Sequence, residues 1–150
     1  MARPEYRPRP RQGGPSGAIT ASVDFNLSSG GSFPATDYFF KLFINYNDNG
    51  GSYDGYFAFL AWGGSAWNLT LYLASGGFTA ALSSSTSVTL SLDTWYTLIL
   101  STDGSGNMTA TVNGQSAAAS DSTYIANTPC ALWTDAANEM SFDNLKVTTP

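Results

Sequence analysis

Apolar and polar residues alternate along most of this chain, and the alternation predicts β-strands with one buried face. In the first run, polar residues separate five apolar ones: Ile19, Ala21, Val23, Phe25 and Leu27. The second run is predicted to place these residues on one face: Tyr38, Phe40, Leu42, Ile44 and Tyr46. Further strands are predicted over residues 53–62, 66–74, 77–82, 88–92, 95–101, 107–113 and 140–147. In the last of these the alternation slips between Phe142 and Leu145, which predicts a β-bulge.

Glycine-rich turns separate the predicted strands at intervals of about 8–12 residues. They include Asn49-Gly50-Gly51, Ser75-Gly76-Gly77 and Asn113-Gly114, all of which supply positive φ at little cost. No run of ten residues has helical periodicity, and 150 residues are enough for one domain. The predicted fold class is therefore all-β: an antiparallel two-sheet β-sandwich of jelly-roll type.

The first seventeen residues differ from the rest, because they are rich in Arg and Pro and end in glycines. Proline restricts its own φ and its predecessor, so residues 1–17 are predicted to form an extended arm and a glycine hinge before a sandwich domain at 18–150. The arm could dock on a neighbouring subunit, remain a solvated tail, or tether nucleic acid. The candidate assembly residues are Arg3, Tyr6, Arg7, Arg9 and Arg11.

Charge is divided between these two parts. The arm holds all four arginines and Glu5, a net charge of +3, whereas the body has two lysines against nine aspartates and Glu139, a net charge of −8. An acidic body repels nucleic acid and anionic membranes, so neither is an expected partner of the folded domain. No apolar run is long enough for a secretion signal or a membrane span, so we expect synthesis in the cytoplasm without a signal peptide and no membrane insertion.

The composition argues against chemistry that uses an imidazole or a pair of glutamates. The chain has no histidine, and its only glutamates are Glu5 and Glu139. Cys130 is alone, which excludes an intrachain disulfide and predicts a small buried thiol. No cofactor is expected. Residues 45–50 are similar to the start of an EF-hand loop, but Tyr56 stands where that loop requires Glu; a looser calcium site using Asp48 and Asp54 competes with a polar turn.

Aromatic residues are the remaining candidates for recognition. In their strands, Tyr56, Trp62 and Tyr72 alternate with a second set, Phe57, Phe59 and Trp67. If the second set fills the core, the first set faces outward beside Asn68 and Thr70. Such a face could be ordinary packing, a protein contact or a glycan site, since Tyr and Trp combine apolar rings with polar groups.

Two stretches carry a family resemblance. They are Trp95–Ser101 with the turn Asp103–Asn107 and the strand end Thr111–Gly114, and the closing strand Met140–Val147. Together they resemble the concanavalin A-like lectin/glucanase superfamily, in its laminin-G-like branch. The resemblance implies a jelly roll over residues 18–149 with adjacent first and last strands. Asp143 resembles a conspicuous position of the superfamily, but we interpret it as a strand-end residue that supports a turn and not as a catalyst.

The catalytic residues of that superfamily do not carry over to this chain. Its glucanases use two glutamates that flank an aspartate, and its lyases typically use His, Arg and Tyr, whereas the body has one glutamate and neither His nor Arg. We therefore expect a protein that is not an enzyme.

Two functions fit these features. The first is a structural assembly protein, such as a virion surface (decoration) protein or an extracellular fibre subunit, whose arm docks on copies of itself or on a larger protein assembly. The alternative is a carbohydrate-binding, lectin-like module that attaches to polysaccharide through its Tyr- and Trp-bearing strands. Fold alone does not choose between them.

Overall fold

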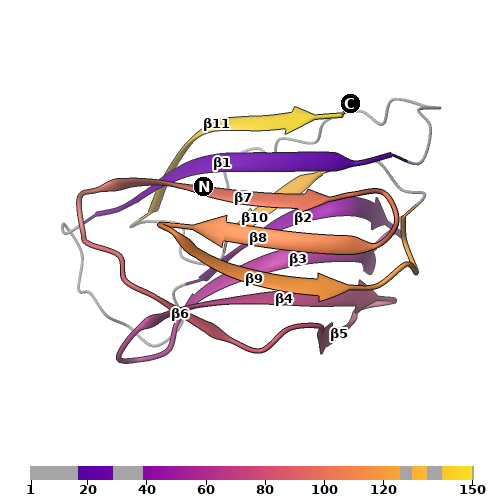
Figure 1. The fold of residues 1–150 in the computed structure, drawn as a ribbon, viewed down its shortest axis with the longest axis horizontal. Helices are drawn as coiled ribbons and strands as arrows, with labels where there is room; N and C mark the ends of the chain where they lie inside the picture. Colours follow the sequence, from indigo (N-terminus) through magenta and orange to yellow (C-terminus); the bar gives the residue numbers. More distant parts are fainter. Residues whose placement is uncertain (1–16, 29–38, 126–129, 135–139, 150) are drawn as a thin grey trace.

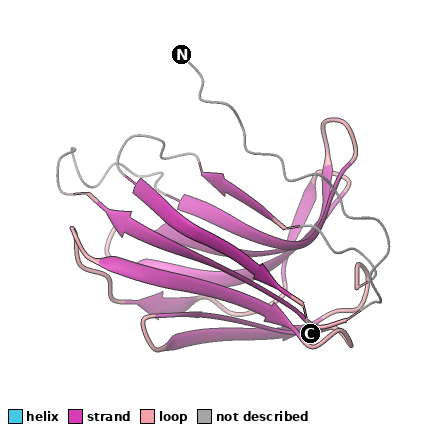
Figure 2. Cartoon of the chain, turned by 90° about the horizontal axis from the view of Figure 1, so that it is seen from above, coloured by secondary structure: helices cyan, strands magenta, loops and turns pink. Residues whose placement is uncertain are grey.

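A computed structural model describes residues 17–28, 39–125, 130–134 and 140–149. Strands and the loops that join them make up this part of the chain, as Figure 2 shows, and none of the described residues is helical. Consequently no helix in the described ranges could cross a membrane. The assembly residues Arg3, Tyr6, Arg7, Arg9 and Arg11 lie outside the described residues.

The strands form two antiparallel sheets that face each other as a sandwich (Figure 1). The five-stranded sheet has the order β11-β1-β7-β8-β9, and the six-stranded sheet has the order β10-β2-β3-β4-β5, with β6 also paired to β4. The bounds of the five-stranded sheet are β1 (Ile19–Leu27), β7 (Trp95–Thr102), β8 (Asn107–Val112), β9 (Gln115–Ser120) and β11 (Met140–Thr148). Those of the six-stranded sheet are β2 (Phe39–Asp48), β3 (Tyr53–Trp62), β4 (Trp67–Ser75), β5 (Phe78–Ala81), β6 (Thr86–Val88) and β10 (Ala131–Thr134).

The first alternating strand buries the face that the sequence predicts. The apolar residues of β1 are at most 2% exposed, and they meet apolar residues of β2, β3, β4 and β7 in one core between the sheets. β1 pairs with both β7 and β11, so the first and last strands are adjacent, as the resemblance implies. The all-β sandwich is thereby confirmed.

The bulge predicted in the last strand is present. The register of β1 with β11 shifts between Ser22 and Asp24, which leaves Asn144 and Leu145 opposite a single residue of β1. Asn144 adopts a φ of 51°, and its backbone amide donates to Asp143 Oδ1. Asp143 therefore lies within β11, beside the bulge, and not at a strand end as expected.

A second bulge lies in β2 and was not predicted. The register of β2 with β3 shifts between Ile44 and Asn47, and Asn45 has a φ of 52°. The extra residue reverses the alternation. Tyr46 was predicted to share the core face of Ile44, but it packs instead against Phe43 on the outer face of the sheet.

Candidate functional site

The outer face of the six-stranded sheet carries a second apolar cluster, separate from the core. Phe43, Phe57 and Ala74 are buried there, and partly buried aromatic residues surround them. Because one side of an antiparallel sheet commonly faces water and is polar, this arrangement is unusual. We call this surface the aromatic face and define it by Phe39, Lys41, Phe43, Tyr46, Tyr53, Phe57, Phe59, Tyr72 and Trp133.

The composition of β3 explains why this face forms. β3 reads Tyr-Asp-Gly-Tyr-Phe-Ala-Phe-Leu-Ala-Trp, so both of its faces are apolar over most of its length. Its outer residues pair with those of the neighbouring strands: Phe57 lies opposite Phe43 on β2 and Tyr72 on β4. Cross-strand aromatic pairs stabilise sheets, and the rings of Phe57 and Tyr72 stack with centroids 5.2 Å apart and planes at 6°.

A lysine lies within this aromatic surface. The strand register places Lys41 between Trp133 on β10 and Phe59 on β3. Its ammonium lies 4.5 Å from the ring centroid of Trp133 and 5.1 Å from that of Phe57. Three more rings have centroids between 5.6 and 5.9 Å away: Phe39, Tyr53 and Phe59. The ring faces stabilise the cation through cation–π attraction.

The polar contacts of Lys41 are few. Its Nζ donates to the hydroxyl of Tyr53 at 3.4 Å, and within the described ranges it forms no ion pair. An ammonium has three N–H donors, so one long hydrogen bond leaves donor capacity unused. The aromatic face therefore combines apolar rings with a half-buried cation that can still donate to an anion or a hydroxyl.

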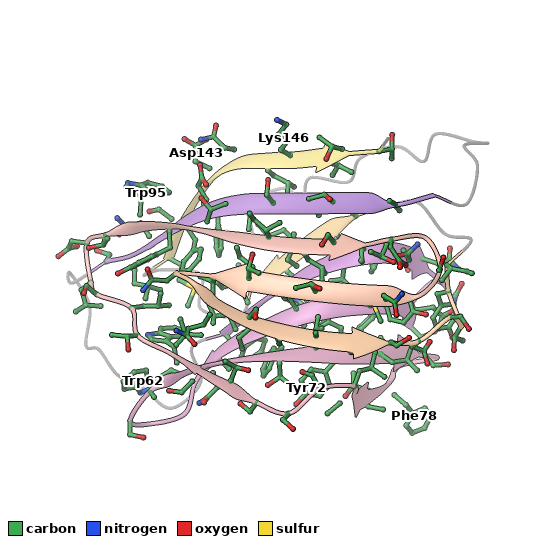
Figure 3. All side chains as sticks on the ribbon, in the orientation of Figure 1. Trp62, Tyr72, Phe78, Trp95, Asp143 and Lys146 are labelled. Carbon is green, nitrogen blue, oxygen red and sulfur yellow. The ribbon has the colours of Figure 1, made fainter. Side chains whose placement is uncertain are left out.

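The predicted contact residues divide between the two faces of the sheet. Asn68, Thr70 and Tyr72 do lie on the outer face, where the latter two pair with Phe59 and Phe57. Thr70 is only 7% exposed, and Asn68 Nδ2 donates to the carbonyl of Ala66 in the β3–β4 turn. Tyr72 is half-exposed and labelled in Figure 3.

The predictions for Tyr56 and Trp62 are wrong. Tyr56 is 1% exposed in the core, and Trp62 packs against the same core, with its ring 5.8 Å from that of Trp67. The alternation in β3 was recognised, but the inner and outer sets were exchanged. Since Tyr56 pairs with core residue Leu73 on β4, the strand register decides the orientation that composition leaves open.

Tyr56 serves the interior instead. Its hydroxyl donates to Asp121 Oδ1 at 2.7 Å and accepts from the backbone amide of Tyr124. Burial raises the pKa of Tyr56 to about 12, and the Asp121 carboxylate adds to the increase. Burial also acts on Asp121, but the hydrogen bonds from Tyr56 and Thr123 lower its pKa. This network ties β3 to the segment after β9 and offers no binding surface.

The proposed calcium ligands are occupied by turn hydrogen bonds. Asp48 Oδ1 accepts from the amide of Gly50, and Asp54 accepts from the amide of Gly76 and from Asn49 Nδ2. The Gly76 amide, more than Asn49, lowers the pKa of Asp54, which burial opposes. Among the described residues, no three carboxylate, thiol or imidazole groups gather into a metal cluster. The bonding fits a polar turn, and the calcium hypothesis stays a prediction.

Cys130 is 7% exposed, as expected for a small buried thiol, and burial raises its pKa to about 12. A thiol in this state is a poor nucleophile at neutral pH, because the thiolate is the reactive form. Cys130 therefore belongs to the packing of the core and not to a reaction site.

The sequence analysis missed Lys41 and Trp133. The signal for Lys41 was present, because Phe39, Lys41 and Phe43 alternate with the predicted core residues of the same strand. No sequence pattern predicted the position of Trp133, because β10 has only four residues and lies between segments without a strand pattern. Trp133 is 48% exposed and directly opposite Lys41, so only the pairing of β10 with β2 brings the two together.

No protein-family model matches the sequence, and no curated protein matches it. Solved structures do. A carbohydrate binding module, CBM66, from Bacillus subtilis is 13% identical with a TM-score of 0.65, covering 87% of this chain and 74% of its own. Sheep galectin-11, in complex with glycerol, is 10% identical with a TM-score of 0.62, over 87% of this chain and 90% of its own.

An alginate lyase from Pseudomonas aeruginosa is also similar, with 12% identity and a TM-score of 0.61 over 90% of this chain and 66% of its own. Identities this low establish the fold and nothing finer. The chain therefore has the concanavalin A-like jelly-roll fold, and the fold that the sequence resemblance implies is confirmed. A carbohydrate binding module, a galectin and an alginate lyase are among the proteins that share it.

Proposed function

We propose that this chain is a carbohydrate-binding module without catalytic activity and that the aromatic face holds the sugar. One observation carries the proposal: the exposed ring of Trp133 and four buried or half-buried rings surround the donor group of Lys41. The apolar faces of sugar rings pack on aromatic rings, and their hydroxyls need donors and acceptors nearby. The folds of a carbohydrate binding module and a galectin support this choice among the candidate functions.

The proposal that the chain has no catalytic activity is supported by the sequence. Glycoside hydrolysis commonly requires a pair of carboxylates on either side of the scissile bond. The aromatic face presents Lys41, rings and hydroxyls, and none of the residues that define it is a carboxylate. The chain has no histidine to act as an alternative base.

A pair of tryptophans provides the test. Trp133 is 48% exposed on the aromatic face, and Trp95 is 53% exposed on the outer face of the opposite sheet, where Figure 3 labels it. We expect Trp133→Ala to weaken polysaccharide binding at least about tenfold, the effect of losing a central aromatic contact. Trp95→Ala, which removes a ring of similar exposure, should leave binding unchanged.

The measurement is affinity electrophoresis against a panel of plant, algal and bacterial polysaccharides, followed by calorimetry with the best ligand. Equal losses from both variants would place binding elsewhere than on the aromatic face. If the unmodified chain binds nothing across the panel, carbohydrate binding is the wrong function. Unchanged thermal unfolding of both variants is the control for folding.

The assembly hypothesis stays a prediction, because the residues on which it depends lie outside the described ranges. It is tested by deleting residues 1–14 and comparing sedimentation velocity profiles of the two forms. If the arm docks on acidic neighbouring surfaces, deletion reduces the size of the sedimenting species, and salt does the same because it screens exposed charges. Identical profiles would remove this hypothesis.

A further inference from the structure

The position of Lys41 suggests which sugars the aromatic face prefers. Resting on the carbohydrate-binding function proposed above, we infer that this face selects a glycan bearing an isolated carboxylate, such as a uronic acid within a neutral chain. Lys41 binds the carboxylate, and the neighbouring rings pack against the sugar that carries it. The argument depends on the surroundings of the ammonium, on its unused donors and on the charge of the whole body.

The ammonium is already partly removed from water. Five aromatic rings lie within 5.9 Å of Nζ, and Lys41 is half-buried. Interactions of charges with one another are stronger where water is excluded. A carboxylate that reaches this cation therefore gains more than it would at an exposed lysine such as Lys146 on β11.

No described carboxylate satisfies this cation. Among the described aspartates, the two nearest in sequence to the face, Asp48 and Asp54, accept hydrogen bonds from turn amides, and Asp121 accepts from Tyr56 on the core side of the sheet. In the described chain Lys41 keeps only the long bond to the Tyr53 hydroxyl. A ligand carboxylate supplies the acceptor that the ammonium lacks, as a charge-assisted hydrogen bond of ordinary length.

The aromatic neighbours limit the ligand further. Trp133 is the exposed ring closest to Nζ, at 4.5 Å, so an anion on Lys41 brings the rest of its molecule over the indole. The remaining members of the face are aromatic, which suits the C–H surface of a sugar ring better than a small inorganic anion. Rings and cation together fit one carboxylated sugar residue.

The overall charge argues against a densely charged polymer. Residues 12–150 carry two lysines and ten acidic groups, and Lys41 is the only basic residue among those that define the aromatic face. A polymer with a charge on every sugar would gain one attractive contact and be repelled by the rest of the surface. A neutral chain with scattered uronic acids keeps the contact and avoids most of the repulsion.

The experiment compares acid and neutral versions of the same glycan. The probes are xylan, galactan and glucan oligosaccharides that each carry one uronic acid, together with the carboxyl-reduced form of each, in which the acid has become a primary alcohol. For the unmodified chain we expect at least one pair in which the acid form binds about tenfold more tightly or better, by calorimetry and Trp fluorescence.

Two lysine variants make the comparison specific. Lys41→Met keeps the length of the side chain and packs well against rings, so the fold should survive. Because Lys41 also donates to sugar hydroxyls, both forms should bind more weakly, but the acid form should lose its advantage of about tenfold over the neutral form. Lys146→Met removes the same charge from an exposed position on β11 and should keep the preference. Lys41→Arg retains the charge and should therefore keep most of the preference for the acid form.

The contrary outcomes separate this inference from the proposed function. If acid and reduced forms bind equally and only Trp133→Ala matters, the carboxylate preference is wrong and carbohydrate binding stands. If no probe binds, both are wrong. Three other results would overturn the inference. Tighter Lys41-dependent binding of dextran sulfate would assign the face to a polyanion, and tighter Lys41-dependent binding of polyglutamate would assign it to an acidic peptide. A dimer that Lys41→Met dissociates in sedimentation would assign the face to a second copy of the chain.

Discussion

The two sheets bury similar inner faces, but their outer faces are opposites. On the five-stranded sheet the outward residues are mainly Ser and Thr, with paired rows such as Thr20–Ser101 and Ser101–Thr109 across adjacent strands. On the six-stranded sheet the corresponding positions hold the aromatic face. One layer therefore follows the usual rule for an antiparallel sheet, with apolar residues inside and polar residues outside, and the other does not.

The difference between the two outer faces shows which side chains the sandwich needs in order to fold. The Ser/Thr face shows that a sheet of this sandwich can be stable with a hydrated outer surface. The aromatic rings on the opposite side are therefore not required to build the sandwich, although their packing stabilises it once they are present. A surface that keeps partly exposed aromatic residues around a half-buried cation is the part of the molecule where a binding function is expected.

The largest expected effect tests whether the aromatic face acts as a second core. Phe57 is 2% exposed and contacts the rings of Phe43 and Tyr72. Phe57→Ala should lower the free energy of unfolding by about 3–5 kcal/mol, as in an interior cavity. Thr109→Ala, on the exposed Ser/Thr face, should stay within about 0.5 kcal/mol of the unmodified chain. Urea unfolding measures both, and similar losses would erase the distinction between the faces.

A smaller effect is expected at the bulge that turns Tyr46 outward. Gly55 lies opposite the bulge with a φ of 133°, and a Cβ there would lie 2.8 Å from the backbone oxygen of Asn45. Gly55→Ala should therefore cost about 1–3 kcal/mol from strain, measured by urea unfolding. Gly64→Ala is the control, because it also has positive φ but meets nothing within 4 Å. Equal losses of unfolding free energy in the two variants would show that the close approach of backbone atoms at the bulge adds no strain.

The smallest effect concerns the polar face and is visible only as a pH dependence. Asp24 accepts hydrogen bonds from Thr97 and Asn144, and these bonds lower its pKa in the folded state. A lowered pKa stabilises the fold above the unfolded value of about 3.9, and this stabilisation is lost as the pH falls through the folded value. Asp24→Asn should therefore be less stable than the unmodified chain at pH 6, with the gap shrinking by pH 2.5.

Urea midpoints at the two pH values measure this gap. A gap that is constant with pH would mean that the charge of Asp24 contributes nothing beyond what an amide provides.

Much of the fold was predictable because one face of most strands is clearly polar. In β1 and β8 only one assignment of inside and outside is consistent with the residues, and the structure adopts it. The turn at Asn113-Gly114 was equally clear, because both residues adopt positive φ there. β10 was not predicted, since four residues are too few to show a period.

The site was less predictable, for a physical reason. In β3 both alternating sets are aromatic or aliphatic, so burial is favourable either way, and the choice depends on pairing with β4. The alternation itself was correct, and Tyr72 was assigned to the right face from the clearer pattern of β4. Lys41 was overlooked because a lysine between phenylalanines resembles an ordinary exposed strand position until Trp133 is placed opposite it.

The bulge at Asn45 has a consequence for how such a surface could change during evolution. Before it, Ile44 points into the core opposite Tyr56; after it, Tyr46 joins the opposite side, where Gly55 leaves room. Gain or loss of one residue at this point would re-aim the end of β2 while the pairs before it stay in register. The aromatic face can therefore be altered by a change in strand length, without any substitution in the core.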